Sequence, residues 1–147
     1  MREKKKEIKT WDTMTYAERG AYILQVEESI RQYGNKELLL LYKLMLETGI
    51  RFGDVLELKE ENVKGRELQV IESKFGGKDY YRNPDGSLPV ISGETVALLE
   101  PDEEGKFFQH DKRYYVVMLR KAFPSKAFNL YYLRQYVIEM KRIQKKV

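Results

Sequence analysis

The sequence contains no cysteine and only one histidine, His110. The lack of cysteine excludes disulfide scaffolds, cysteine-ligated zinc sites and cysteine nucleophiles, and a single histidine excludes a histidine-rich metal site. No apolar run approaches the roughly 20 residues that cross a bilayer, and the basic residues 1–9 are not followed by the apolar core of a signal peptide. We therefore expect a soluble, cytoplasmic protein of the cell interior that works without a cofactor, a metal or a membrane.

The chain is long enough for one hydrophobic core. It has 147 residues, of which 42% are apolar and 34% charged, which is typical of a single globular domain. Residues 106–147 hold eleven Lys or Arg against two acidic residues, a net charge of +9, whereas residues 1–105 carry a net charge of −5. Such asymmetry is typical of chains that bind nucleic-acid phosphates, although a solvated helix face would give the same pattern.

Apolar residues at helical spacing predict several helices around one central, apolar helix. Thr15 and Glu18 have the spacing of a capping box, and Gly49 supplies a left-handed cap after a helix that is apolar on nearly every face and is expected to be buried. Residues 1–12 are expected to form a mobile basic arm and residues 13–147 a single domain. The expected helices cover residues 16–33, 37–47, 52–58, 92–99, 112–122 and from about 128 onward.

Between residues 67 and 91 the apolar period changes to two, which predicts strands. Three short strands are expected over residues 68–72, 80–81 and 88–91, separated by turns at residues 76–77 and 83–86. The expected fold class is therefore α+β, mainly α, with a small three-stranded antiparallel sheet inserted between helices.

Three basic residues occupy places where a cation can act on an anion. Arg51 follows Gly49 beside the most hydrophobic helix, and Asp54 at i+3 lies where it would orient the guanidinium. An ordinary Arg–Asp surface pair has the same spacing. Lys74 precedes a glycine turn from which an ammonium can reach a ligand, and Arg134 lies among aromatic residues near the core.

These stretches, in this order, resemble the catalytic domain of the tyrosine recombinases, the phage-integrase family. Residues 48–56, Thr-Gly-Ile-Arg-x-x-Asp-Val-Leu, are similar to the family's Thr-Gly-Leu-Arg-x-x-Glu-Leu box. The Lys74 segment, followed by Leu-Pro-Val at residues 88–90, resembles the hairpin of the catalytic lysine, with Lys78 as a second candidate. Residues 131–134, Tyr-Tyr-Leu-Arg, correspond to the His-x-x-Arg box.

The resemblance implies site-specific DNA recombination or integration by phosphoryl transfer without a metal. Arg51 and Arg134 are implied to hold the non-bridging oxygens of a DNA phosphate, Lys74 to protonate the leaving 5′-oxygen, and Tyr131 at most to donate a hydrogen bond. Double-stranded DNA is the implied partner, with further integrase subunits as additional ones. The residues expected to contact DNA are Lys78, Arg120, Lys121, Lys126, Lys141 and Arg142.

The sequence also departs from the family pattern. Asp54 replaces a glutamate, Tyr131 replaces the box histidine, and Gln135 stands where a second histidine often follows, which is more similar to integrases of archaeal viruses. The family's nucleophilic tyrosine lies well beyond Val147, so we expect this chain to be truncated before it and inactive alone. Two alternatives stay open: a non-enzymatic DNA-binding accessory protein on the same fold, and an unrelated α+β interaction module.

Overall fold

The computed structural model describes residues 10–145, without the side chains of Phe75 and Lys145. The described chain is mainly helical, with a small antiparallel sheet, so the coarse fold class expected from the sequence is confirmed. The α-helices are α1 (Tyr16–Tyr33), α2 (Lys36–Thr48), α3 (Phe52–Leu56), α4 (Gly93–Leu98), α5 (Lys112–Ala122) and α6 (Leu130–Lys145). The shorter elements are the 3-10 turns η1 (Trp11–Thr13), η2 (Glu60–Asn62) and η3 (Lys74–Gly76) and the strands β1 (Val63–Lys64) and β2 (Glu67–Leu68).

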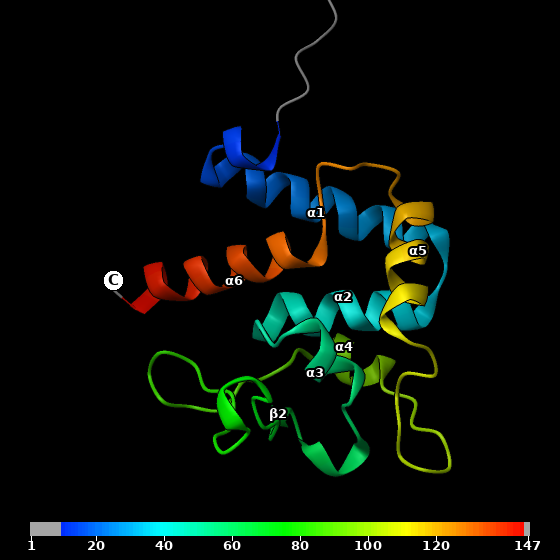
Figure 1. Cartoon of the computed structure of the whole chain (residues 1–147), viewed down its shortest axis with the longest axis vertical. Helices are drawn as coiled ribbons and strands as arrows, with labels where there is room; N and C mark the ends of the chain where they lie inside the picture. Colours follow the sequence, from blue (N-terminus) through cyan, green and yellow to red (C-terminus); the bar gives the residue numbers. More distant parts are fainter. Residues whose placement is uncertain (1–9, 146–147) are drawn as a thin grey trace, which may run out of the picture.

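Helix α2 is the centre of the fold. It contacts α1, α3, α4, α5 and α6, with α1 and α6 on one side and α3 and α4 on the other (Figure 1). The expectation of a buried central helix is confirmed, because apolar side chains all round the helix are shielded from solvent. Those buried on α2 are Leu38, Leu40, Leu41, Tyr42, Leu44 and Met45.

The end of α2 determines where α6 can lie. Gly49 caps α2 with a left-handed φ of 75°, which glycine adopts without steric cost. A Cβ on Gly49 would lie 3.3 Å from Cγ1 of Val137 on α6, so the missing side chain also allows the close approach of that helix. The glycine therefore turns the chain into α3 and brings α6 against the turn.

Side-chain caps set several helix starts. The capping box of Thr15 and Glu18 is present at α1, as expected from the sequence. The last helix was expected from about residue 128 but begins at Leu130, because the side chain of Asn129 accepts a hydrogen bond from the backbone N–H of Tyr132 at 2.9 Å.

The folded domain begins before residue 13. Trp11 is 2% exposed, and its ring stacks on Tyr132 of α6 and meets Phe128 edge-on. The boundary expected at residue 12 between a basic arm and the domain therefore lies too far along the chain, because the buried Trp11 belongs to the core. Residues 1–9 of that expected arm lie outside the described residues.

The β insert is less regular than expected. Within the described residues, the only sheet has two strands, β1 and β2, which pair across a turn at Gly65. The three segments expected to be strands are instead joined by two isolated bridges, Glu67 to Val90 and Ile71 to Tyr80. Proline at position 89 has no N–H to donate and the turns are glycine-rich, so a continuous three-stranded ladder does not form.

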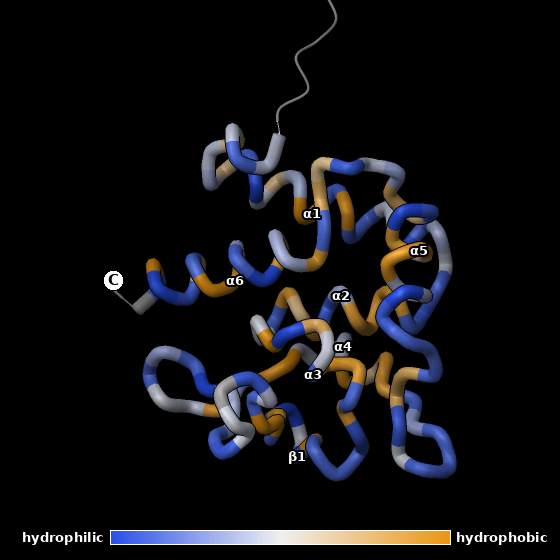
Figure 2. Tube along the Cα trace, in the orientation of Figure 1, coloured by the Kyte–Doolittle hydropathy of each residue, from blue (hydrophilic) through white to orange (hydrophobic). Residues whose placement is uncertain are grey.

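Residues 70–81 form a hairpin that projects toward the end of α2; we call it the 70–81 hairpin. Its arms are held by the Ile71–Tyr80 bridge and by a hydrogen bond of 2.9 Å from the N–H of Tyr81 to the carbonyl oxygen of Val70. The loops below α2 are mostly hydrophilic in Figure 2, as solvated connections should be. None of the helices within residues 10–145 has the length and apolar character needed to cross a bilayer.

Candidate functional site

Arg51 lies at the N-terminal end of α3, where the chain leaves α2. Its Nη1 atom lies 2.5 Å from Oε2 of Glu72 and 3.4 Å from the hydroxyl of Tyr81, both on the 70–81 hairpin. The backbone N–H of Arg51 also donates to the Tyr81 hydroxyl, at 3.4 Å. The guanidinium is thus held between α3 and the hairpin, with its side chain 25% exposed.

Asp54 is linked to Arg51 by hydrogen bonds through the hydroxyl of Tyr81. The Tyr81 hydroxyl donates to Oδ2 of Asp54 at 2.6 Å, and the N–H of Ser73 donates to the same oxygen at 3.2 Å. Burial opposes ionisation of Asp54, but the hydrogen bonds from Ser73 and Tyr81 and the charge of Arg51 outweigh it and lower the pKa of the carboxyl. Asp54 was expected beside Arg51, but no sequence motif marks Tyr81 as the residue that joins them.

Arg134 reaches the same site from α6. Its Nε donates to the carbonyl oxygen of Gly49 at 2.8 Å, although the two residues are 85 positions apart. Burial and then the positive charge of Arg51 lower the pKa of Arg134, while the negative charge of Glu72 raises it. Arg51 and Glu72 therefore both lie near enough to Arg134 for their charges to act on it.

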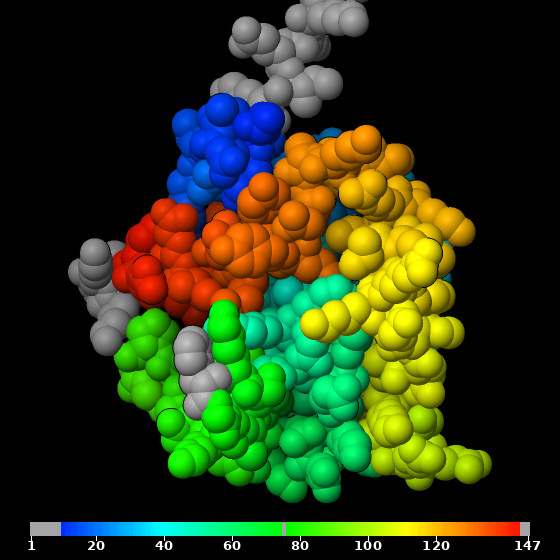
Figure 3. Space-filling model, in the orientation of Figure 1, coloured from blue at the N-terminus to red at the C-terminus, as the bar shows by residue number. Residues whose placement is uncertain are grey.

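A cleft of about 260 Å³ opens beside Arg134, between α6, the end of α2 and the 70–81 hairpin. Four of its lining residues are basic and one, Glu72, is acidic, so the cleft has a positive lining suited to an anion. In Figure 3, α6, α3 and the hairpin meet on the face turned toward the viewer. The basic lining residues are Arg82, Arg134, Lys141 and Arg142.

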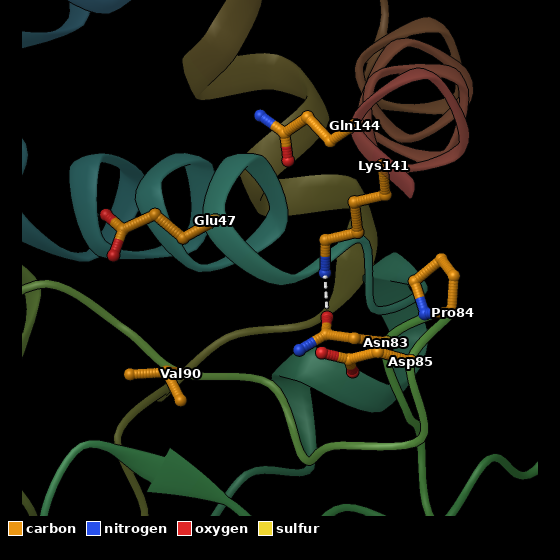
Figure 4. A pocket seen from close by; sticks show the side chains of 7 residues that line it. All are labelled: Glu47, Asn83, Pro84, Asp85, Val90, Lys141 and Gln144. Atoms are coloured by element: carbon orange, nitrogen blue, oxygen red, sulfur yellow. Dashed lines mark hydrogen bonds between the residues drawn. The ribbon is translucent and has the colours of Figure 1, made fainter. Parts of the chain in front are cut away.

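Lys141 has protein partners on both sides. Its Nζ donates to the carbonyl oxygen of Thr48 at 2.9 Å and to Oδ1 of Asn83 at 2.7 Å, and burial lowers its pKa. Figure 4 shows the ammonium pointing at Asn83, in a neighbouring pocket of about 350 Å³. Its position joins α6 to α2 and to the loop that contains Asn83 and Asp85, and it also lines the cleft, so its expected contact with DNA stays a prediction.

The two candidate catalytic lysines lie on the tip of the 70–81 hairpin. Lys74 was expected just before a glycine turn, and it starts the 3-10 turn η3, which leads into the left-handed glycines 76 and 77. Both Lys74 and Lys78 are exposed. Ser73, next to Lys74, donates to Asp54, so the tip is attached to the arginine site at its Lys74 end.

The other predicted residues do not all gather at the cleft. Tyr131 is 64% exposed on the first turn of α6, three residues before Arg134. Arg142 lines the cleft. Arg120 instead lines a separate groove together with Tyr131. The remaining two, Lys121 and Lys126, are exposed at the end of α5 and in the loop after it.

Comparisons of the chain with family models, curated proteins and solved structures find no match. Among residues 10–145, no three His, Cys, Asp or Glu side chains are arranged to hold a metal ion. The features that indicate a function are therefore the positions of the arginines and the residues that surround them.

Proposed function

We propose that this chain binds duplex DNA and holds one backbone phosphate between Arg51 and Arg134, as the catalytic domain of a tyrosine recombinase does. The observation that supports the proposal is that Arg134 lines a basic cleft and bonds the backbone of Gly49, while Arg51 contacts Glu72, which lines the same cleft. Arginine suits this task because its planar guanidinium stays charged and presents several N–H donors to phosphate oxygens.

The site would stabilise charge on a phosphate during transfer. Arg134 is half-buried, and cations in a partly dry site interact more strongly with developing negative charge than cations in water. In the proposed reaction, the two guanidinium groups hold the non-bridging oxygens and Lys74 or Lys78, at the hairpin tip, gives a proton to the leaving 5′-oxygen. Tyr131 would donate a hydrogen bond where the family has a histidine.

The attacking group in this proposal is a tyrosine outside the last helix. Tyr132 stacks on Trp11, and the ring of Tyr136 stacks on Tyr16 with centroids 5.0 Å apart, so both rings pack toward the N-terminal elements of the fold. Tyr131 is only three residues before Arg134. The proposal therefore assigns the attack on phosphorus to a tyrosine of a further segment or of another subunit, whose hydroxyl would attack while the 5′-oxygen leaves, with Tyr80 at the cleft as the alternative within this chain.

The second candidate is a DNA-binding accessory protein that holds phosphate without cutting DNA. Two features favour this alternative. Arg51 already has a carboxylate partner in Glu72, and Tyr131 replaces the histidine that the recombinase family has beside its second arginine. The two candidates share the phosphate site and differ only in whether a covalent intermediate forms.

The experiment that tests phosphate binding is a salt titration of duplex DNA affinity by fluorescence anisotropy. Each phosphate contact contributes about −0.9 to the slope of log affinity against log salt. We expect Arg51→Ala and Arg134→Ala each to reduce the steepness by about 0.9, and the double variant by about the same amount, because both arginines hold one phosphate. Lys106→Ala, which removes one charge from an exposed residue outside this site, is the matched control. Unchanged slopes in both arginine variants would contradict the proposal.

A further inference from the structure

Glu72 occupies the position in which an anion would meet Arg51. Its Oε2 lies 2.5 Å from Nη1 of Arg51, and its charge also acts on Arg134 across the cleft. A carboxylate and a phosphodiester present the same feature to a guanidinium, namely two oxygens that share one negative charge. Glu72 thus acts as an internal counter-ion for the arginine pair.

The two carboxylates near Arg51 differ in how firmly they are held. Asp54 is 8% exposed and accepts hydrogen bonds from Tyr81 and Ser73, so it cannot leave without losing both. Glu72 is 29% exposed in its side chain and lines the cleft itself. A carboxylate at the wall of an open cleft can move into water at little cost, whereas a buried one cannot.

Only the side chain of Glu72 has to move for an anion to reach Arg51. The backbone N–H of Glu72 donates to the carbonyl oxygen of Asp79 at 2.9 Å, and the bridge of Ile71 to Tyr80 holds the preceding residue. The N–H of Ser73 is bonded to Asp54. The backbone is therefore fixed on both sides, so rotation of the side chain can open the site without unfolding the hairpin.

We propose that Glu72 is a displaceable counter-ion of the arginine site. It keeps small anions out of the site, whereas DNA binds strongly enough to displace it. This inference rests on the proposed function, because it assumes that phosphate binds between Arg51 and Arg134. A free phosphate gains little by exchanging places with the carboxylate, since one anion replaces another. A DNA strand brings neighbouring phosphates to the other cations at the cleft, Arg82 and Arg142, and these contacts offset the loss of the internal ion pair.

The test uses Glu72→Gln, which keeps the shape of the side chain and removes its charge. Titration with inorganic phosphate, followed by NMR shifts of the arginine side chains, should show affinity higher by about tenfold than in the natural sequence. Glu103→Gln is the matched control, because it removes the same charge from an exposed residue of another loop, and it should change the affinity by less than about twofold. Adding Arg51→Ala to Glu72→Gln should abolish the gain.

The possible results separate the two proposals. If Glu72→Gln binds phosphate no more tightly than the natural sequence while Arg51→Ala and Arg134→Ala weaken DNA binding, the counter-ion role is wrong and the phosphate site remains. If phosphate binds none of the proteins and the arginine variants bind DNA normally, the phosphate site itself is wrong. Should Glu72→Gln fail to fold, Glu72→Asp, whose shorter side chain cannot make the same contact, should give a smaller gain; no gain there overturns the inference.

Discussion

The Nε of Arg134 donates a hydrogen bond of 2.8 Å to the carbonyl oxygen of Gly49, two residues before Arg51. This bond attaches α6 to the backbone that carries the other arginine. It uses only one of the five N–H donors of the guanidinium, so the contact that positions Arg134 is separate from the face that would meet a phosphate. The spacing of the two arginines is therefore set by the main chain at the end of α2.

Replacing Arg134 with lysine tests this relationship. Lysine keeps the charge but has no donor at the position of Nε, and its single ammonium cannot bond Gly49 and a phosphate in the same way. We expect Arg134→Lys to lower the free energy of unfolding in urea by about 1 kcal/mol and to weaken DNA binding. Arg142→Lys, on the same helix and exposed, should change neither quantity appreciably. An Arg134→Lys protein with normal stability and normal affinity would show that the Gly49 contact does not position the side chain.

Protonation of Asp54 should destabilise the fold in acid. The pKa of Asp54 is lowered below its ordinary value of 3.8 in the folded protein, so the folded state favours the ionised carboxylate more than the unfolded chain does. The stabilisation is complete above pH 3.8 and is lost as the pH falls through the lowered pKa of the folded state. Urea unfolding from pH 6 down to about pH 2 should show a smaller acid-induced loss for Asp54→Asn than for the natural sequence. Parallel pH profiles for the two proteins would exclude Asp54 as a source of the acid sensitivity.

Much of the helical fold could be predicted from the sequence because its signals are local. Thr15 and Glu18 are three residues apart, and Gly49 directly follows the helix that it ends. The apolar spacing of the central helix needs no knowledge of its neighbours. The expected sheet was less accurate, because bridges such as Glu67 to Val90 depend on how distant loops meet.

The site could be predicted only in part. Arg51 and Arg134 were identified from short motifs, but Glu72 and Tyr81 belong to none, and they contact Arg51 across 21 and 30 positions of sequence. Lys141 shows the opposite difficulty. Its place in a basic stretch predicts a DNA contact, but nothing in that stretch indicates that folding also brings the carbonyl of Thr48, 93 positions away, to its ammonium. Neither the partners nor the burial of such residues is visible before the chain folds.

Lys141 and Arg142 should therefore respond differently to substitution. Lys141→Met removes the donor to Thr48 and Asn83 and leaves a carbonyl without its partner, so we expect it to destabilise the protein by about 1–2 kcal/mol in urea unfolding. Arg142→Ala should leave stability nearly unchanged and reduce the salt slope of DNA binding by about 0.9, because an exposed cation at the cleft can contact a phosphate. Equal effects of the two variants on stability and on the slope would contradict this division of roles.

Covalent chemistry on DNA needs a nucleophile as well as the arginines. Arginine and lysine stabilise a transition state but do not attack phosphorus in this reaction, so residues 1–147 alone should form no covalent adduct with a nicked suicide substrate, as judged by denaturing gel. Adding a tyrosine-bearing segment, fused after Val147 or supplied by another subunit, should restore the phosphotyrosyl intermediate: the tyrosine oxygen bonds to phosphorus and the 5′-oxygen leaves with a proton.

Substituting the arginines in that restored system separates binding from catalysis. Arg51→Ala and Arg134→Ala should each abolish the adduct while most of the DNA affinity remains, because a contact made in the transition state affects rate more than ground-state binding. Lys106→Ala should leave adduct formation intact. An adduct formed by residues 1–147 unaided would overturn the prediction and point to Tyr80, which lines the cleft and is 43% exposed. Loss of that adduct in Tyr80→Phe would then identify the nucleophile, since phenylalanine keeps the ring and removes only the attacking oxygen.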